Sequence, residues 1–502
     1  MKKIVVLFLL ILCTMPLWAQ IDQPQRIELD IELGDDYFNT VSAGSKGLFL
    51  YREVKNRETK MERKFEVYFL DTALNVVWEE NYYVHLRYFN IGYEYCDKYF
   101  YLLFQQNVNS LKADLFVFRI HLEDQRFETF LIERDFPMDL TEFEVIENTL
   151  IFSGYTDERP TVVCYDFGKS QPNVLPGFYK EKNKILQVEI DSINNRFNVL
   201  TSFQTNDRRK SVSIRSFDPE GNMLQNVNLL PSGENSLLYG RSVHVNDDFI
   251  LVAGTYTKKR SDMSRGIYLS AIAPNGEHVI YYYNYADLKN FFSYMKIRKR
   301  KRVEERISRR KIKGRKIKFS YRLIVHDVIK QGNQYIMVGE AFYPKYGSSP
   351  YNSYYGYNTW GNMTYFLGYH YTHAVVIGFD EKGHLLWDNS FEIKDVTTYD
   401  LKQYVHVAGS GDSFALLYIY DNEIRSKVVY GNDLIEGKSY DDLALSFTDA
   451  HAEINPDSEF GGLENWYKNT LYAYGVEKIW NIRALGMKSS KDVFFINKIK
   501  YK

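Results

Sequence analysis

The stretch that decides the fold runs from Ser242 to Tyr285 and reads SVHVNDDFILVAGTYTKKRSDMSRGIYLSAIAPNGEHVIYYYNY. It predicts four short strands: the first ends at the polar turn 246–248, the second spans 249–256, the third begins near 266 and the fourth includes 281–283. The turn Pro274-Asn275-Gly276 stands between two apolar runs, and an Asn-Gly pair in that position is typical of a type I′ hairpin. This unit recurs along the chain.

Composition favours a β protein with a large core. The chain has 502 residues, of which 45% are hydrophobic, 25% charged and 16% aromatic, with 42 Tyr. Tyr and Phe fit the half-buried surface of a pleated sheet, and the composition excludes a disordered chain.

The second predicted strand of the unit, FILVAGTY at 249–256, belongs to a set of eight similar strands. They start at Leu48, Tyr99, Thr149, Phe197, Phe249, Tyr335, Phe414 and Val493. The first four spacings are 51, 50, 48 and 52 residues. Periods of this size with four strands per unit are typical of propeller blades. Inner strands that are apolar on both faces, such as YIMVGEAF at 335–342, fit blades packed between two others.

The outer hairpins carry a signature of their own, in turns such as DTALN at 71–75, DPEGN at 218–222 and DEKGH at 380–384. The stretches YFLDTALNVVWEENY and VVIGFDEKGHLLWDNSFEI resemble the repeats of secreted bacterial β-propellers, in which an Asp, a Gly turn and an outer-strand Trp recur. The resemblance implies an all-β propeller over residues 21–502. It implies no active residue, because propellers host many unrelated functions.

The number of blades follows from counting hairpins. Eight inner hairpins but seven complete outer ones are visible, and RIELDIEL at 26–33 is available to complete the eighth and remove exposed sheet edges. We predict eight blades, with seven plus an extra hairpin as the alternative.

The N-terminus predicts export. Lys2 and Lys3, an apolar run at 4–12 and the possible cleavage site 17–19 form a secretory signal peptide at 1–20. No other stretch approaches the length of a membrane-spanning helix. The expected location is periplasmic, outer-membrane associated or extracellular. The remaining cysteines, Cys96 and Cys164, fall in different repeats and are expected to be small buried hydrophobes without a disulfide.

The last three spacings, 86, 79 and 79 residues, predict insertions at about 287–318, 343–372 and 439–475. Within the first, 296–318 holds 14 Lys or Arg and two Glu, a net charge of +12 in a chain whose net charge is −1. We expect a helix capped by Asp287, beginning at Leu288 and ended by Gly314. Two interpretations stay open: contact with a polyanion, or a solvated helix docked on the acidic body. The candidate contact residues are Arg298, Arg300, Arg302, Arg309 and Arg310.

The second insertion interleaves Tyr and Trp with Gly, Ser and Asn, a mixture typical of binding surfaces. The alternative is a loop that shields its own blade. Strand direction in a meander predicts that this insertion and the basic one share a face. The third insertion, 439–475, receives no role. The candidate contact residues of the second are Tyr351, Tyr354, Tyr355, Tyr357 and Trp360.

Catalytic and metal motifs are missing from the sequence: there is no HExxH, Gly-x-Ser-x-Gly, P-loop or Cys-x-x-Cys. His370 and His373 form a lone His-x-x-His, which without a third ligand favours a polar loop pair over zinc. We therefore expect a non-catalytic binding or scaffold propeller of the cell envelope, without cofactor. Its predicted partner is an acidic protein, anionic lipid or anionic glycan, and export argues against nucleic acid. The alternative is a glycan-binding or glycan-processing propeller, which would need paired carboxylates in the central channel.

Overall fold

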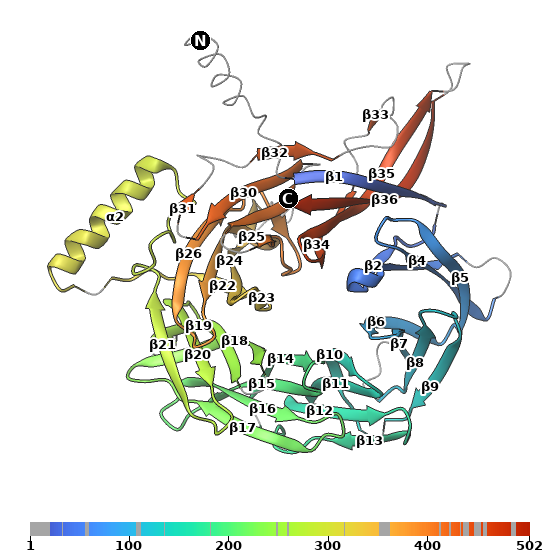
Figure 1. The fold of residues 1–502 in the computed structure, drawn as a ribbon, viewed down its shortest axis with the longest axis horizontal. Helices are drawn as coiled ribbons and strands as arrows, with labels where there is room; N and C mark the ends of the chain where they lie inside the picture. Colours follow the sequence, from blue (N-terminus) through green and yellow to red (C-terminus); the bar gives the residue numbers. More distant parts are fainter. Residues whose placement is uncertain are drawn as a thin grey trace, which may run out of the picture.

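The eight predicted blades form a closed ring (Figure 1). The computed structural model describes residues 21–501 except 33, 56–59, 107–111, 135, 181, 247–248, 259–260, 316, 351–361, 411–412, 421–422, 432, 435–440, 446–452, 455–458 and 483–487. The predicted signal peptide at 1–20 therefore lies outside the described residues.

Blades 1 to 4 are regular antiparallel meanders of four strands each. Their strands are β2 (Asn39–Ser42), β3 (Leu48–Val54), β4 (Glu62–Leu70) and β5 (Val76–His85); β6 (Tyr88–Cys96), β7 (Tyr99–Gln106), β8 (Leu115–His121) and β9 (Phe127–Ile132); β10 (Asp139–Ile146), β11 (Thr149–Thr156), β12 (Arg159–Asp166) and β13 (Gln171–Val174); β14 (Lys184–Asp191), β15 (Arg196–Gln204), β16 (Lys210–Phe217) and β17 (Met223–Leu229).

Blades 5 to 8 follow the same plan with additions, and short strands extend the edges of the last three. Their elements are β18 (Asn235–Asn246), β19 (Phe249–Lys258), β20 (Gly266–Ile272) and β21 (His278–Asn284); helix α2 (Ile297–Ile312); β22 (Arg322–Val325), β23 (Ile329–Gln331), β24 (Gln334–Pro350), β25 (Asn362–Phe379), β26 (Leu385–Glu392) and β27 (Thr397–Thr398); β28 (His406–Ser410), β29 (Ser413–Tyr420), β30 (Glu423–Tyr430), β31 (Asp433–Leu434) and β32 (Asp441–Ala444); β33 (Glu453–Ile454), β34 (Glu459–Tyr467), β35 (Thr470–Ile482), β36 (Lys488–Tyr501) and β1 (Ile21–Ile31).

The apolar second strands are buried on both faces, as predicted. In β19, Ile250 and Val252 pack into the cluster between blades 4 and 5, whereas Leu251 and Ala253 pack into the cluster between blades 5 and 6. A strand that is covered on both sides needs apolar residues at every position, which explains the uninterrupted apolar runs in the sequence.

The recurring Asp of the outer hairpins closes its own turn. Asp71 Oδ1 accepts hydrogen bonds from the backbone N–H groups of Ala73 and Asn75, at 2.8 and 2.9 Å. Asp218 and Asp380 bond to the backbone of their own turns in the same way. These are Asx-turns, in which a short side chain replaces a backbone acceptor.

The turn at 274–276 differs from the predicted type I′ geometry. Only Gly276 has a positive φ, of 83°, and its N–H donates to the carbonyl of Ala273. The N–H of Ala273 in turn donates to the carbonyl of Glu277. The turn is therefore a three-residue loop that ends in a left-handed Gly, the next commonest hairpin connection.

Strand β1 closes the ring by pairing with β36 in the last blade, as predicted (Figure 1). The alignment of that blade needs a correction, because Val493 lies in β36, the third strand. The first two strands are β34 and β35, so most of 459–475 belongs to blade 8, while β32 pairs with β30 at the outer edge of blade 7.

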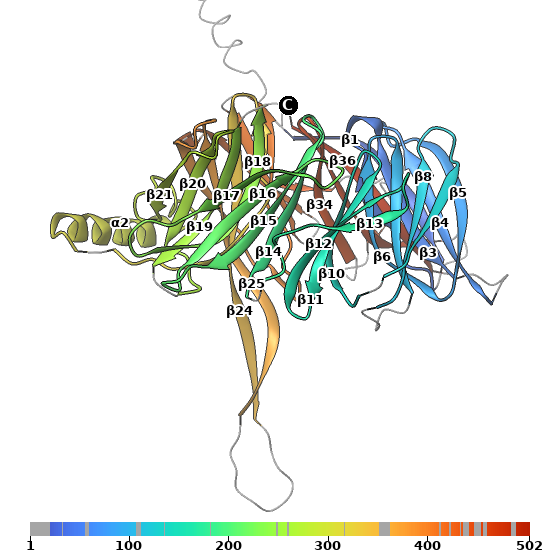
Figure 2. The ribbon, with the colours of Figure 1, turned by 90° about the horizontal axis from the view of Figure 1, so that it is seen from below.

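The basic and aromatic insertions leave blade 6 in different directions, which contradicts the expectation of a shared face. Figure 2 shows α2 leaving the outer side of the ring, whereas β24 and β25 extend as a long two-stranded ribbon from one face. Among the described residues α2 is the single α-helix, which agrees with the predicted helical insertion.

Candidate interaction surface

The segment before α2 is fixed to the outer strand of blade 6, and this displaces the start of the helix from the predicted Leu288 to Ile297. The Asp388 carboxylate on β26 accepts the backbone N–H groups of Lys289 and Asn290, at 2.8 and 2.7 Å. Burial raises the pKa of Asp388 although these two bonds lower it. The backbone N–H groups of Lys289 and Asn290 are therefore bonded to blade 6, so this tertiary contact overrides the helical tendency of the segment.

The expected capping residue, Asp287, instead forms an ion pair with Lys311 near the other end of α2, at 2.9 Å. The described position before the helix is Lys296, which makes no side-chain capping bond. At its C-terminal end the chain leaves the helix at Gly314, whose φ is +58°, so that part of the prediction is confirmed.

Helix α2 contacts the propeller through Val303 and Ile307, which are half-buried beside the cluster that contains Phe292. Because successive residues are 100° apart around a helix, these contacts fix which side chains face solvent. Of the five predicted contact arginines, Arg300 and Arg310 lie half-buried on the flanks of the helix. The other three, called here the outer stripe, are exposed: Arg298, Arg302 and Arg309.

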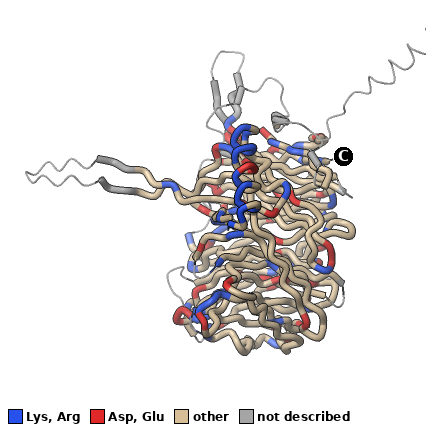
Figure 3. Tube along the Cα trace, turned by 90° about the vertical axis from the view of Figure 1, so that its left-hand side faces the viewer, with Lys and Arg blue, Asp and Glu red and all other residues tan. Residues whose placement is uncertain are grey.

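The outer stripe carries unneutralised charge. Arg300 pairs with Glu304 at 2.7 Å, but within the described part of the chain none of the three stripe guanidinium groups forms an ion pair. Figure 3 shows Lys and Arg along the whole helix, with few acids beside them. On its flank the helix faces another cation, Lys427 of β30. Burial, and then the charge of Arg300, lower the pKa of Lys427 to about 8. The propeller wall beneath the helix therefore supplies little neutralisation for it.

The predicted aromatic contact residues, Tyr351, Tyr354, Tyr355, Tyr357 and Trp360, all lie outside the described residues. What the structure does describe is the root of the ribbon, residues 342–350 and 362–371. It exposes aromatic side chains that the sequence-based list did not include: Tyr343 (47% exposed), Tyr346 (62%), Tyr365 (52%) and Phe366 (37%).

A cavity of about 510 Å³ opens at this root. Cross-strand pairing produces its floor, because Pro344 lies opposite Tyr369 and Tyr346 opposite Phe366 on one face of the ribbon. The rings of Phe366 and Tyr369 are 5.0 Å apart, edge to face. We call this the ribbon pocket; its lining residues are Arg322, Phe342, Pro344, Tyr346, Phe366, Tyr369 and Leu401.

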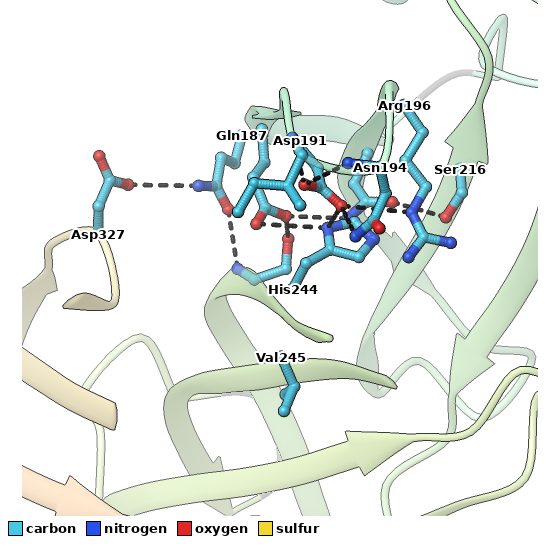
Figure 4. A network of polar contacts seen from close by, with 12 residues as sticks. Gln187, Asp191, Asn194, Arg196, Ser216, His244, Val245 and Asp327 are labelled. Atoms are coloured by element: carbon cyan, nitrogen blue, oxygen red, sulfur yellow. Dashed lines mark hydrogen bonds and ion pairs between the residues drawn. The ribbon is translucent and has the colours of Figure 1, made fainter. Parts of the chain in front are cut away.

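The innermost strands carry a second polar constellation, around the ring's centre. His244 on β18 faces Asp191 of β14, with 3.3 Å between Nδ1 and Oδ2, and Asn198 also lies 3.3 Å from that nitrogen (Figure 4). Bonds from Asn194 and the charge of His244 hold the pKa of Asp191 below its usual range against the effect of burial. This network links blades 4 and 5.

Carboxyl groups continue along the inner strands of blades 2 and 3. Burial raises the pKa of both Glu94 and Glu144, and for Glu144 the nearby Glu94, Glu142 and Asp327 raise it further. Asp327 of blade 6 accepts a hydrogen bond from Gln187 (Figure 4). It also pairs with Arg241, at 3.4 Å. Sequence alone could not show that these acids meet.

The His-x-x-His pair lies in strand β25 and not in a loop. His370 is paired with Thr397 near the surface, whereas His373 is fully buried and stacked on Tyr294, with 3.7 Å between ring centroids. The described residues contain no group of three or more His, Cys, Asp or Glu able to hold a metal ion. Of the two free cysteines, Cys164 is buried and Cys96 half-buried. No helix in the described ranges is long and apolar enough to cross a membrane.

No known protein family and no curated protein sequence matches the chain. Among solved structures it is similar to polysaccharide lyase Uly1, at 9% identity and a TM-score of 0.39, covering 94% of this chain and all of the other. It is also similar to an acylaminoacyl peptidase from Pyrococcus horikoshii, at 9% identity and a TM-score of 0.36, covering 80% of this chain.

The chain spans about half the length of that peptidase. These similarities concern the fold alone. The strand pairing of this chain shows that it is an eight-bladed β-propeller closed by its N-terminal strand. Blade 6 carries a basic helix and an aromatic ribbon.

Proposed function

We propose that this protein is a binding propeller that docks a polyanionic partner on blade 6, through α2 and the ribbon. The observation that carries the proposal is the outer stripe: Arg298, Arg302 and Arg309 are exposed on a helix anchored to a rigid blade, and none of them forms an ion pair with another described residue. A fixed, unneutralised row of cations attracts an anionic surface and raises the rate of encounter.

The helix itself gains from such a partner. Positive side chains four positions apart, such as Arg298, Arg302 and Arg306, repel one another and destabilise an isolated helix. An anionic surface laid over the stripe removes that repulsion. Ion pairs that form this way are screened over about 8 Å at physiological salt, so the interaction weakens as salt rises.

The ribbon supplies the short-range contact in this proposal. Exposed Tyr and Phe side chains provide large contact areas at a small cost in conformational entropy, and such residues dominate binding energy at interfaces. Tyr351, Tyr354, Tyr355, Tyr357 and Trp360 remain proposed contacts on the same grounds. The leader-like sequence at 1–20 supports a location in the cell envelope or outside the cell.

Charge reversal of the outer stripe tests the proposal. The variant R298E/R302E/R309E is expected to bind immobilised polygalacturonate and polyglutamate at least tenfold more weakly than the wild type in 50 mM salt. The difference is expected to shrink in 500 mM salt, where Coulomb attraction is screened. Biolayer interferometry with both polymers measures it.

A matched control changes the net charge equally at exposed positions away from blade 6's helix: K98E/K258E/K382E. Equal weakening by the control, or no weakening by the stripe variant, would show that α2 is not the docking element. A wild type that binds neither polymer would refute the proposed function itself.

A second candidate function is glycan cleavage in the central channel, and the observation that favours it is the Glu94 and Glu144 pair. A carboxyl group whose pKa is raised by burial and by neighbouring acids can act as a general acid beside an ionised partner. Release of new reducing ends from polygalacturonate or alginate by the wild type, and its loss in Glu144→Gln, would establish this activity. No release by the wild type would leave binding as the function.

A further inference from the structure

We infer that the ribbon pocket is a subsite for one sugar ring of a uronate polysaccharide, a polymer that carries a carboxylate on each unit. The inference rests on the proposed function and deepens it, because it names the polyanion that the blade 6 surface would hold. Four features of the pocket carry it: its size, its aromatic lining, its single charged residue and the protection of the neighbouring strand edge.

The pocket is large and open enough for a ring rather than a single side chain. Its volume of about 510 Å³ lies within the range of ligand sites, which is roughly 300–1,000 Å³. Five of the seven lining residues are aromatic or proline, and Tyr346 is 62% exposed. Because Tyr346 is largely exposed, a ligand can reach the pocket from solvent.

The lining offers two kinds of surface at once. The rings of Phe342, Tyr346, Phe366 and Tyr369 present flat apolar faces, and the two tyrosines end in hydroxyl groups that can donate and accept hydrogen bonds. A pyranose ring has the complementary form, with an apolar C–H face and hydroxyl groups around its rim. An extended peptide would match the aromatic faces but has no ring of hydroxyls.

Among the described residues that line the pocket, Arg322 is the one that carries a charge. A planar guanidinium group pairs with a carboxylate through two parallel hydrogen bonds, which favours a uronate over a neutral sugar. Arg322 follows the end of α2 by ten residues, so a chain seated in the pocket begins beside the segment that returns from the basic helix. Further carboxylates along the same polymer could then meet the outer stripe.

The strand edge next to the pocket is poorly suited to a polypeptide strand. Strand β22 covers β24 only as far as Phe342, and the next positions on that edge include Pro344 and Lys345. Proline provides no N–H for a strand ladder, and lysine and proline on an edge are common devices against strand addition. Main-chain pairing with a partner protein is therefore disfavoured where the pocket lies.

The test compares two polymers of equal charge per unit, polygalacturonate and polyglutamate, on the full-length protein. Tyr346→Ala and Phe366→Ala are expected to weaken polygalacturonate binding by about tenfold each, and to leave polyglutamate binding within about twofold of the wild type. Alginate, a second uronate polymer, is expected to follow polygalacturonate. Both variants remove exposed side chains, so folding should be retained, and a thermal melt verifies this.

Tyr83→Ala is the matched control, because Tyr83 is a 44% exposed tyrosine on β5 of blade 1, outside both α2 and the ribbon. It is expected to leave both affinities unchanged. Equal loss for both polymers in the pocket variants would show that the pocket takes a polypeptide, and unchanged binding of both uronate polymers would show that it takes neither. In either case the proposed function would still hold if the R298E/R302E/R309E variant bound the polymers more weakly than the wild type.

Discussion

Replacing Arg26 by methionine is expected to lower the free energy of unfolding by about 3–5 kcal/mol, because it leaves a buried carboxylate without its counter-charge. Arg26 lies on β1, the strand that closes the ring, and its Nη2 is 2.7 Å from Glu477 Oε2 on β35. The side chains of Arg26 and Glu477 are 5% and 1% exposed. The pair therefore connects two strands that are not neighbours, across β36.

Other contacts fix the same guanidinium group. It donates to Asn497 at 2.9 Å and lies over the ring of Phe495, with 4.4 Å to the ring centroid. Burial raises the pKa of Glu477, and Arg26 opposes that rise. Without Arg26 the Glu477 carboxyl would have to take up a proton or stay charged in a low-dielectric interior, and both outcomes disfavour the closed blade.

Urea unfolding followed by tryptophan fluorescence measures the effect. The double variant R26M/E477L is expected to recover at least half of the lost stability, because it removes both buried charges of this pair and leaves apolar side chains. Glu28, whose Oε1 lies 2.6 Å from Arg26 Nε, loses its partner equally in the single and the double variant. Arg126→Met is the control: its side chain is 84% exposed and paired with Asp124 at the surface, so little change is expected. A double variant as unstable as R26M would show that the loss comes from packing and not from charge.

Much of the fold could be predicted because the same physical constraints apply in each of the eight blades. A middle strand covered on both sides must be apolar throughout, and the Asp of the outer turn must bond its own backbone. The same reasoning misplaced the last unit. Strands β35 and β36 are both apolar middle strands, so a pattern match could settle on Val493 in β36 and pass over Leu471 in β35.

The candidate site was predictable in part. Charge counting identified α2, and helical geometry then separates exposed from half-buried arginines once Val303 and Ile307 are known to face the propeller. The start of the helix could not be predicted, since Asp388, about a hundred residues away, holds the N–H groups of Lys289 and Asn290. The ribbon pocket depends on cross-strand register, although the alternation of Phe342, Pro344 and Tyr346 was a signal for one aromatic face.

Acid is expected to destabilise the propeller below pH 6.5, because two histidines are buried in the neutral form. Burial lowers the pKa of His373 and of His406 to about 3. His373 is enclosed by Tyr294, Phe291 and Tyr321, and Thr372 lies 2.9 Å from its Nδ1. Near His406 the positive charge of His326 lowers the pKa further.

The direction in which stability changes with pH depends on whether the folded or the unfolded chain binds more protons. Between pH 6.5 and about 3 the unfolded chain protonates these histidines and the folded chain does not, so stability is complete above pH 6.5 and falls as pH falls. At pH 5 the loss is about 2 kcal/mol for each histidine. Carboxyl groups with raised pKa, such as Asp388 and Glu144, act in the opposite direction, because the folded state holds their protons more tightly.

Comparing variants with the wild type separates the two effects. Urea unfolding of His373→Phe and of His406→Asn at pH 7.5 and pH 5.0 is expected to show a loss on acidification that is smaller than the wild type's by about 2 kcal/mol in each case. His85→Asn, at an exposed side chain on β5, is expected to keep the wild-type loss. The carboxyl contributions are common to all four proteins, so a wild-type loss unchanged in both buried variants would mean that neither imidazole governs the acid sensitivity.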